Sequence, residues 1–141
     1  MVADTSAFMA ILLQEEDGLL YRDTLLAAAR VFISTATAVE LHIVVTAKLG
    51  SEGILRLDRL LALPLFEIVP VDHQQMNIAN QAYERFGKGR HRAKLNYGDL
   101  FSYALAKKTE LPLLFKGDDF SKTDLKSCPL EQQKEHDDPK R

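Results

Sequence analysis

The sequence predicts an α/β fold in three layers, with a central parallel sheet covered by helices on both faces. Short apolar runs typical of buried strands alternate along the chain with longer segments of helical periodicity, the pattern of strand–helix–strand crossovers. Glycines and prolines punctuate several of the junctions. The chain has 141 residues, of which 46% are hydrophobic, so it suits one domain with a single core.

The first half of the chain contains start and stop signals for two strands and four helices. Asp4, Thr5 and Ser6 are possible N-caps directly after a short apolar run, so a strand-to-helix turn is expected there. Gly50 ends one later helix and Pro64 ends the next. Strands are expected over residues 1–3 and 31–33, and helices over residues 7–13, 19–30, 34–48 and 51–63.

The second half continues the alternation. Asp72 is placed to cap a helix, and Gly87 and Gly89 end it. Strands are expected over residues 66–71 and 111–115, and helices over residues 73–86 and 97–109. Residues 131–141 contain no aliphatic side chain and are expected to be solvated. We therefore assign the domain to residues 1–127 and a polar C-terminal tail to residues 128–141.

Charge and cysteine content exclude several classes of protein. Acidic and basic residues nearly cancel to a formal net charge of −2, so binding to nucleic acid must use a local basic patch. Cys128 is the single cysteine, which excludes an internal disulfide and a cysteine-rich zinc site and suits a reducing compartment. With no signal-like start and no apolar run near the ~20 residues that cross a bilayer, we expect a cytoplasmic protein without a membrane span.

Four short acidic segments lie in or beside apolar sequence, and they carry the functional prediction. Their acids are Asp4, Glu40, Asp99 and the adjacent pair Asp118 and Asp119. A carboxylate removed from water is unfavourable unless it has a partner, so several of them in apolar surroundings indicate a shared divalent cation. Carboxylate oxygens suit Mg²⁺ or Mn²⁺, and no histidine or cysteine pair has the spacing of a zinc site.

Three of the four segments also have a purely structural interpretation. Asp4 can be a helix N-cap, and Asp99 can form a capping pair with Asn96. Asp118 and Asp119 follow a glycine at the end of a predicted strand, where acids are ordinary turn residues. One of this pair is expected to face the metal site, and the other to hydrogen-bond the turn.

Glu40 is the acid that structural roles explain least well. It is the only acid between residues 36 and 47, and it shares a helical face with Ala36, Ile43, Val44 and Ala47. The alternative is that this stripe faces solvent at Glu40, or that a buried arginine pairs with it. We expect Glu40 to converge with the aspartates on one edge of the sheet.

A carboxylate cluster of this kind is suited to phosphodiester hydrolysis. Mg²⁺ held by a few carboxylates keeps water molecules, binds phosphate oxygens and lowers the pKa of an attacking water. Asp4 and Asp99 are expected to be direct ligands. Glu40, with Asp118 or Asp119, is expected to complete the site directly or through water.

Hydroxyl and basic side chains near the acids are the candidate supporting residues. Thr5 or Ser6 is placed to orient a metal-bound water. The basic segment before Asp99 contains no acid and would hold a phosphate backbone, although a solvated loop explains it as well. The candidate RNA-binding residues are Lys88, Arg90, Arg92 and Lys94.

Four segments of the sequence resemble the VapC toxins, which are PIN-domain ribonucleases. They are residues 2–7 (VADTSA), 37–40 (TAVE), 86–91 (FGKGRH) with 95–99 (LNYGD), and 113–120 (LLFKGDDF). The resemblance covers about residues 1–125 and implies a PIN-like α/β/α fold, Mg²⁺-dependent endoribonuclease activity, a homodimer and inhibition by a VapB-type antitoxin.

The resemblance also implies roles for individual acids. Asp4 and Asp99 match the metal-binding acids, and Glu40 matches the acid between them. Gly117 stands where many PIN domains carry the fourth acid, so Asp118 or Asp119 must substitute.

Two other functions fit parts of the pattern. A haloacid-dehalogenase-type phosphatase requires two aspartates separated by one residue after its first strand, and Thr5 and Ser6 follow Asp4 instead. A catalytically silent PIN-fold module that binds nucleic acid or protein is the other alternative, and the intact acids argue against it. The apolar helices over residues 19–29 and 54–63 offer a groove for an antitoxin helix, although core packing explains them equally well.

Overall fold

The computed structural model describes residues 1–130 and contains one four-stranded sheet in which every pairing is parallel. Its strands are β1 (Val2–Ala3), β2 (Val31–Ser34), β3 (Phe66–Val69) and β4 (Leu113–Leu114). The order across the sheet is β3-β2-β1-β4, so the N-terminal strand lies in the interior of the sheet. Parallel neighbours need long crossover connections, which the helices between the strands provide.

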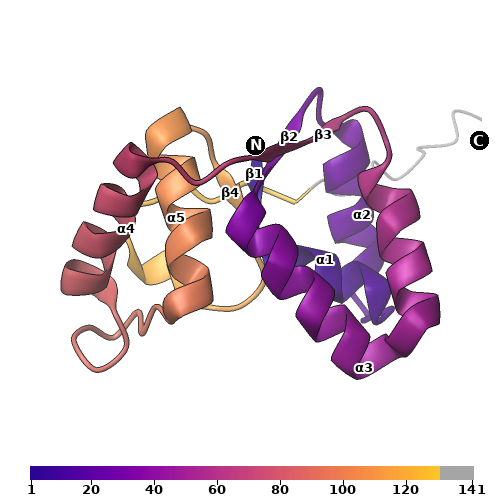
Figure 1. Cartoon of the computed structure of the whole chain (residues 1–141), viewed down its shortest axis with the longest axis horizontal. Helices are drawn as coiled ribbons and strands as arrows, with labels where there is room; N and C mark the ends of the chain where they lie inside the picture. Colours follow the sequence, from indigo (N-terminus) through magenta and orange to yellow (C-terminus); the bar gives the residue numbers. More distant parts are fainter. Residues whose placement is uncertain (131–141) are drawn as a thin grey trace, which may run out of the picture.

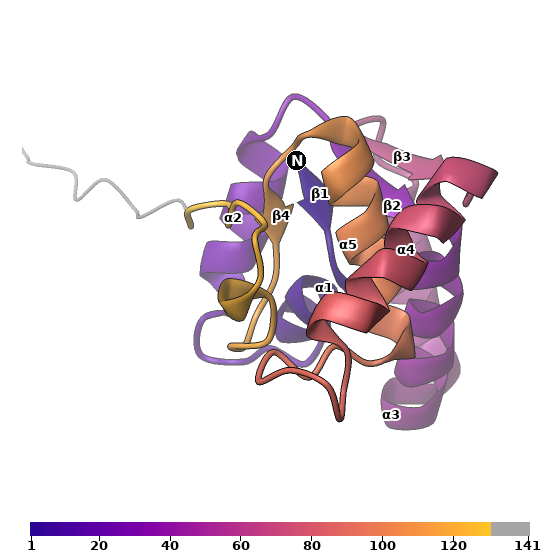
Figure 2. The same ribbon diagram turned by 90° about the vertical axis from the view of Figure 1, so that its left-hand side faces the viewer.

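Helices cover both faces of the sheet, as Figure 1 and Figure 2 show. On one side lie α1 (Thr5–Leu12), α2 (Gly18–Ala27) and α3 (Thr35–Leu61), and on the other lie α4 (His73–Phe86) and α5 (Tyr97–Thr109). A short 3₁₀ helix, η1 (Phe120–Lys122), follows β4. The three-layer α/β/α fold predicted from the sequence is confirmed.

Each face of the sheet has its own apolar core. Ala3 and Leu114 belong to the cluster beneath α1, α2 and α3, whereas Val2 and Leu113 belong to the cluster beneath α4 and α5. Successive residues of a strand point to opposite faces, so even a two-residue strand contributes to both cores. All four side chains are 1% exposed or less, and the middle of the sheet is therefore buried on both faces.

The carboxyl ends of the strands meet at one edge of the sheet, because all the strands run in the same direction. Asp4 follows β1, α3 begins directly after β2, and the loop with Asp118 and Asp119 follows β4. The first turn of α5 lies against α3 there, since a Cβ added at Gly98 would collide with the Glu40 carboxylate. The four acidic segments thus come together from distant parts of the chain.

Most element boundaries follow the predicted caps. Asp4 caps α1, Asp72 caps α4 and Asn96 caps α5, each through a side-chain hydrogen bond to the first turn. The two helices predicted on either side of Gly50 form one element, α3, which is kinked where Gly50 takes a left-handed φ of 63°. β3 and β4 are shorter than predicted, and α2 ends at Ala27.

The buried face of α3 differs from the prediction. Thr37, Leu41 and Val45 are buried at a spacing of four residues. Ile43, which we predicted to share an apolar stripe with Glu40, is 62% exposed. The prediction that the apolar side chains near Glu40 form the buried face of the helix was wrong. The buried face instead includes a polar residue, Thr37, which can be buried because its hydroxyl has a hydrogen-bond partner in the interior. Glu40 lies at the boundary between core and solvent.

The chain after β4 remains in contact with the core. The Cys128 N–H donates to the Leu113 carbonyl at 2.9 Å, and Cys128 and Leu130 pack against the cluster beneath α1, α2 and α3. The rest of the expected tail, residues 131–141, lies outside the described residues. Within residues 1–130, no helix combines the length and apolar character that a bilayer crossing requires.

Candidate active site

Asp4 is a buried acid that caps a helix and also faces the carboxyl edge of the sheet. It is 4% exposed. Its Oδ2 accepts hydrogen bonds from the Ser6 backbone N–H at 3.1 Å and from Ser6 Oγ at 2.7 Å. Its Oδ1 accepts from Ser102 Oγ at 2.7 Å. Three donors compensate for the water that the carboxylate has lost, which allows Asp4 to remain buried.

Ser102 and Thr37 support Asp4 from helices on opposite faces of the sheet, and the sequence analysis missed both. Both side chains are buried, and Ser102 Oγ on α5 lies 3.1 Å from Thr37 Oγ1 on α3. Because the single hydroxyl proton of Ser102 is donated to Asp4, Thr37 must donate to Ser102. The available signal was a serine within the apolar run of α5, three residues after Asp99 and on the same helical face.

Glu40 reaches the site from α3, and its carboxylate lies between α1 and α5. Its Oε1 accepts a hydrogen bond from Thr5 Oγ1 at 2.6 Å. On the other side, a Cβ added at Gly98 would lie 1.7 Å from Glu40 Oε2, so only glycine lets the first turn of α5 approach this closely. Within residues 1–130, no lysine or arginine forms an ion pair with Glu40, which argues against the structural alternative of a buried arginine partner.

Asp99 forms the predicted capping pair with Asn96, and the charges of other acids raise its pKa. Its Oδ2 accepts from the Asn96 N–H at 2.9 Å, while Asn96 Oδ1 accepts from the Asp99 N–H at 3.0 Å. The pKa of Asp99 is raised to about 7, first by burial and then by the negative charges of Asp4, Asp119 and Glu40, against the opposing effect of the Asn96 N–H. The predicted capping pair of Asn96 and Asp99 is confirmed.

Asp119 is the acid of the last segment whose charge raises the pKa of Asp99, and Asp118 has no part in that effect. Both are exposed. The carbonyl of Asp118 accepts from Ser121 Oγ at 2.6 Å and belongs to the turn, which the buried Phe120 anchors. Of the two adjacent acids, only Asp119 is among the charges that raise the pKa of Asp99.

The loop that carries Asp119 is bonded to the beginning of the chain. The backbone N–H of Lys116 donates to Ser6 Oγ at 2.9 Å, so the serine that binds Asp4 also positions this loop. The Lys116 ammonium group binds Asp17 at 2.8 Å and also binds Glu15, in the connection between α1 and α2. These contacts fix the direction from which Asp119 approaches the other acids.

The donor set suits a hard divalent cation, although the carboxylates are now arranged for hydrogen bonds to the protein. Burial is the main cause of the raised pKa of Asp99, and the charges of Asp4, Asp119 and Glu40 add to it. The hydroxyls of Thr5 and Ser6 are engaged with Glu40 and Asp4. In the described part of the chain, no three His, Cys, Asp or Glu side chains stand in an arrangement that could hold a metal ion. Carboxylate oxygens are nevertheless the donors that Mg²⁺ and Mn²⁺ prefer, so the residue types present are compatible with such an ion.

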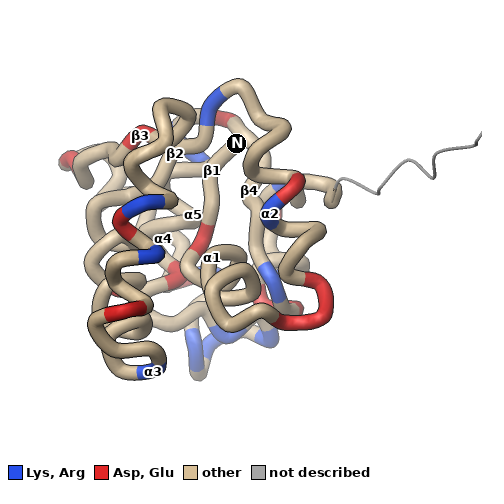
Figure 3. Tube along the Cα trace, turned by 90° about the vertical axis from the view of Figure 1, so that its right-hand side faces the viewer, with Lys and Arg blue, Asp and Glu red and all other residues tan. Residues whose placement is uncertain are grey.

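The predicted RNA-binding loop lies directly before α5. Its ends are joined, because the Lys88 N–H donates to the Leu95 carbonyl and the Leu95 N–H donates to the Phe86 carbonyl, each at 2.9 Å. The exposed basic side chains of this loop are Lys88, Arg90, Arg92 and Lys94. None of them forms an ion pair with an acid of residues 1–130. Figure 3 shows several basic positions at the lower edge of the molecule and acidic positions nearer its centre.

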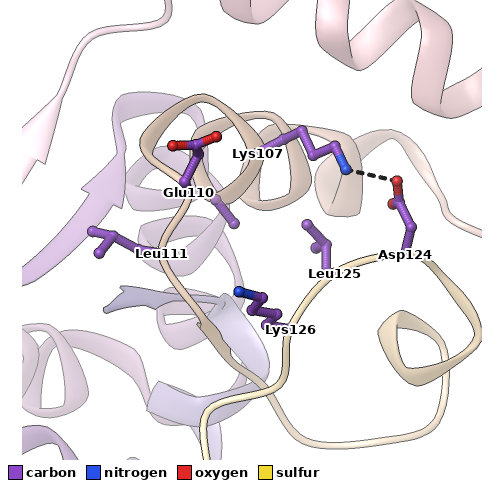
Figure 4. Close-up of a pocket in the computed structure, with 7 residues that line it drawn as sticks. Lys107, Glu110, Leu111, Asp124, Leu125 and Lys126 are labelled. Atoms are coloured by element: carbon purple, nitrogen blue, oxygen red, sulfur yellow. Dashed lines mark hydrogen bonds and ion pairs between the residues drawn. The ribbon is translucent and has the colours of Figure 1, made fainter.

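A hollow of about 210 Å³ lies at the opposite end of α5, away from the acids (Figure 4). Its labelled lining residues are Lys107, Glu110, Leu111, Asp124, Leu125 and Lys126. Lys107 Nζ lies 2.7 Å from Asp124 Oδ2, and the hydroxyl of Tyr103 donates to Asp124 Oδ1 at 2.6 Å. Because these charged groups are paired with each other, the hollow is a structural feature rather than the candidate site.

The sequence matches one protein family over almost the whole domain. The family described as PIN domain matches residues 1–126. A protein called ribonuclease VapC, from Mycolicibacterium smegmatis, is 47% identical to this chain over 125 residues. That match covers 89% of this chain and 97% of the relative.

Two solved structures have a similar fold. The crystal structure of VapC20 from Mycobacterium tuberculosis, described as a sarcin-ricin loop cleaving toxin, has a TM-score of 0.75 at 14% identity and covers 90% of this chain and 97% of that one. VapBC2 from Rickettsia felis, bound to a DNA fragment from its promoter, has a TM-score of 0.72 at 17% identity and covers 92% and 98%. These identities support the fold alone, whereas the sequence matches show the family. The chain belongs to the PIN-domain family, in its VapC group.

Proposed function

We propose that this protein is a metal-dependent endoribonuclease that hydrolyses RNA phosphodiester bonds and acts as the toxin of a VapBC-type toxin–antitoxin system. The observation that carries this proposal is that acids from four distant segments follow the same edge of the sheet, where the charges of three of them add to burial and raise the pKa of the fourth, Asp99, to about 7. The name of the relative at 47% identity, ribonuclease VapC, supports the same activity for this chain.

The acids Asp4, Glu40, Asp99 and Asp119 are the residues that would hold Mg²⁺, with Mn²⁺ as a substitute. The chemistry that such an ion supplies when bound is a lowered pKa of the attacking water and stabilisation of charge on the phosphate. With a pKa of about 7, Asp99 holds a proton in a large fraction of the molecules at neutral pH. Ligand carboxylates must be deprotonated, so Asp99 would have to release that proton in order to hold a cation.

The neighbouring hydroxyl groups hold the carboxylates in place. Ser6 and Ser102 donate to opposite oxygens of Asp4, and Thr5 donates to Glu40. Carboxylates that are orientated before the substrate arrives need less rearrangement during the reaction. We propose that these three residues keep the acids at the edge of the sheet against their mutual repulsion.

The basic loop is the proposed binding site for the RNA backbone. With a net charge of −2, the chain needs a local patch to attract a polyanion. The exposed side chains of Lys88, Arg90, Arg92 and Lys94 supply one, just before the α5 turn that carries Asp99. The proposed substrate is intracellular RNA, so the proposed location is the cytoplasm.

The proposed partners are a VapB-type antitoxin and a second copy of this chain. A hollow of about 450 Å³ beside α1 and α2 includes Ile11 and Leu19, the latter 56% exposed, together with the charged side chains of Glu15, Glu16, Arg22 and Arg56. An amphipathic antitoxin helix would bury its apolar face there. For a dimer, Val39 and Ile43 on α3 are 61% and 62% exposed and are candidate contacts, which light scattering of the purified protein would test.

The proposed activity is tested by expressing the wild type beside Asp99→Asn and a control, Asp58→Asn, on the distal half of α3. We expect the wild type and the control to arrest growth and to cleave total RNA with Mg²⁺ or Mn²⁺ but not with EDTA, and Asp99→Asn to do neither. Equal cleavage by wild type and Asp99→Asn would show that the metal-site proposal is wrong. Wild-type protein that binds RNA and cleaves it with neither ion would instead be a catalytically silent PIN-fold module.

A further comparison tests which neighbouring acid completes the site. Asp119→Asn is expected to lose cleavage, because Asp119 is the acid whose charge reaches Asp99. Asp118→Asn is expected to retain most of it. The opposite order of activities would reverse the assignment of the fourth acid.

A further inference from the structure

Tyr97 is an aromatic side chain left in solvent beside the candidate active site. It is 79% exposed, the largest exposed fraction of any large hydrophobic side chain in residues 1–130. It begins α5, two residues before Asp99. Its ring is supported by Phe101 one turn later, with the ring centroids 5.0 Å apart in an edge-to-face arrangement. A single exposed aromatic ring is ordinary, but Tyr97 continues into an exposed apolar surface that includes Met76 and Tyr83, and contiguous surfaces of this kind mark binding sites.

Tyr97 stands at the edge of an uncharged groove between α4 and α5, which lie side by side in Figure 1 and Figure 2. The groove has a volume of about 470 Å³, and every side chain in its lining is uncharged. Met76 and Tyr83 from α4 are 43% and 45% exposed. Asn80, on the same helix, adds an amide group that can donate and accept hydrogen bonds. The groove therefore offers a mainly apolar surface, with the Asn80 amide and two tyrosine hydroxyls as polar groups.

The charges around the groove favour a nucleic acid as its occupant. The basic loop leads directly into the turn that carries Tyr97, and no acid occurs between residues 85 and 98. The guanidinium of Arg90 lies over the Tyr83 ring, 5.7 Å from its centroid, so the cationic loop and the aromatic groove are in contact. A polyanion whose bases carry flat π-faces matches both parts, whereas a protein helix would match only the groove.

We propose that Tyr97 stacks against an unpaired nucleobase of the RNA next to the scissile phosphate. This inference rests on the proposed ribonuclease function. The bases of a duplex are stacked on one another and cannot reach a ring on the protein surface, whereas unpaired bases can be splayed out onto an aromatic side chain. Tyr97 would thereby select the RNA conformation, while the basic loop binds its backbone.

The test is a double-mutant cycle in which Tyr97 is substituted in the protein and single bases are removed from the RNA. The proteins are wild type, Tyr97→Ala, Tyr97→Phe and a control, Leu55→Ala, whose side chain is 56% exposed on the distal half of α3. The first substrate is a single-stranded oligonucleotide that the wild-type protein cleaves. The others are copies of it in which a single abasic site replaces one nucleotide near the cleavage point, at a different position in each copy. Single-turnover cleavage gives kcat/KM, and binding is measured by fluorescence anisotropy in EDTA, where no cleavage is expected.

On the intact oligonucleotide, Tyr97→Ala should lower binding and kcat/KM by about tenfold or more, whereas Tyr97→Phe and Leu55→Ala should change them little. At one abasic position the wild type should fall to the level of Tyr97→Ala, and the variant should lose nothing further. That non-additivity identifies the stacked base. Circular dichroism and thermal melting establish that each variant is folded.

Three outcomes overturn the proposal. Tyr97→Ala that binds and cleaves like wild type excludes a role in binding. Losses that add at every abasic position show that Tyr97 contacts no base. A reduced mass of Tyr97→Ala in light scattering, together with lost cleavage, identifies the groove as a contact between copies of the chain. If the wild type cleaves no RNA, the proposed ribonuclease function fails, and the anisotropy cycle still decides whether Tyr97 stacks on a base.

Discussion

Replacing Asp99 by asparagine should stabilise the metal-free protein at neutral and alkaline pH, although it should abolish the proposed activity. The pKa of Asp99 is about 7 in the folded protein, against 3.8 for the isolated side chain. Ionisation of Asp99 is therefore less favourable in the folded state, because burial removes its water and because Asp4, Asp119 and Glu40 repel its charge. Asparagine keeps a side-chain oxygen that can accept the Asn96 N–H, so the helix cap can persist.

The sign and size of the effect follow from proton linkage. Between the two pKa values the folded protein binds more protons than the unfolded chain, so the contribution of Asp99 to stability decreases as the pH rises through this interval and is fully lost above it. At 1.36 kcal/mol per pKa unit, the rise from 3.8 to about 7 corresponds to about 4 kcal/mol. Asp99 is partly exposed, and solvent screening reduces the expected effect to about 2 kcal/mol.

The assay is urea denaturation of wild type, Asp99→Asn and Asp58→Asn in EDTA, at about pH 4.5 and about pH 8. Most of the interval lies between these conditions, so the advantage of Asp99→Asn over wild type should grow by about 1.5 kcal/mol from the lower to the higher pH. Asp58→Asn should follow wild type at both. Mg²⁺ added at the higher pH should stabilise wild type more than Asp99→Asn. If wild type and Asp99→Asn have the same pH dependence, Asp99 does not carry the unfavourable charge.

Three other substitutions test separate contacts. Ser102→Ala removes the hydrogen-bond donor to Asp4 Oδ1 and a hydrogen-bond partner of Thr37, so the free energy of unfolding should fall by about 1–2 kcal/mol. Cleavage by this variant should also require a higher Mg²⁺ concentration. An unchanged Mg²⁺ titration would show that Ser102 does not position Asp4. Gly98→Ala should lower the melting temperature, because the added Cβ would collide with the Glu40 carboxylate. Alanine in a helix is otherwise more stable than glycine by up to about 1 kcal/mol. Adding Glu40→Ala should recover the stability but not the activity, and a stabilised single variant would contradict the contact. Leu19→Asp replaces an exposed apolar side chain of the hollow beside α1 and α2 by a charged one. A coexpressed antitoxin should then no longer copurify with the protein or inhibit it, while RNA cleavage itself persists. Continued copurification would show that the antitoxin binds elsewhere.

The elements that the sequence predicted well depend on short-range interactions. Asp72, Asn96 and Asp99 bond to backbone groups within three residues of themselves, so their capping roles can be read from neighbouring residues alone. The sequence also predicted that a helix ends at Gly50, where the structure has a kink within α3, because the φ of 63° at this position is one that other residues rarely adopt.

The features that the sequence did not predict depend on which residues meet across the fold. The buried face of α3 is marked by Thr37, whose partner Ser102 lies 65 positions away along the chain. The choice between Asp118 and Asp119 depends on a loop that Lys116 bonds to Ser6, a contact across 110 positions. Periodicity carries no information about either distance, so the acids were identified as a set before their exact arrangement could be known.

The hydroxyl contact between Thr37 and Ser102 also bears on how the molecule holds together. It joins a helix of one outer layer to a helix of the other, directly beside β1, which has only two residues in which to hold the layers in register. Glu40 of α3 and Gly98 of α5 are also in contact between the same two helices. A small slide between the layers would therefore separate the acids while leaving every helix intact. We expect hydrogen exchange at the first turns of α3 and α5 to report this loss of alignment before circular dichroism detects any unfolding.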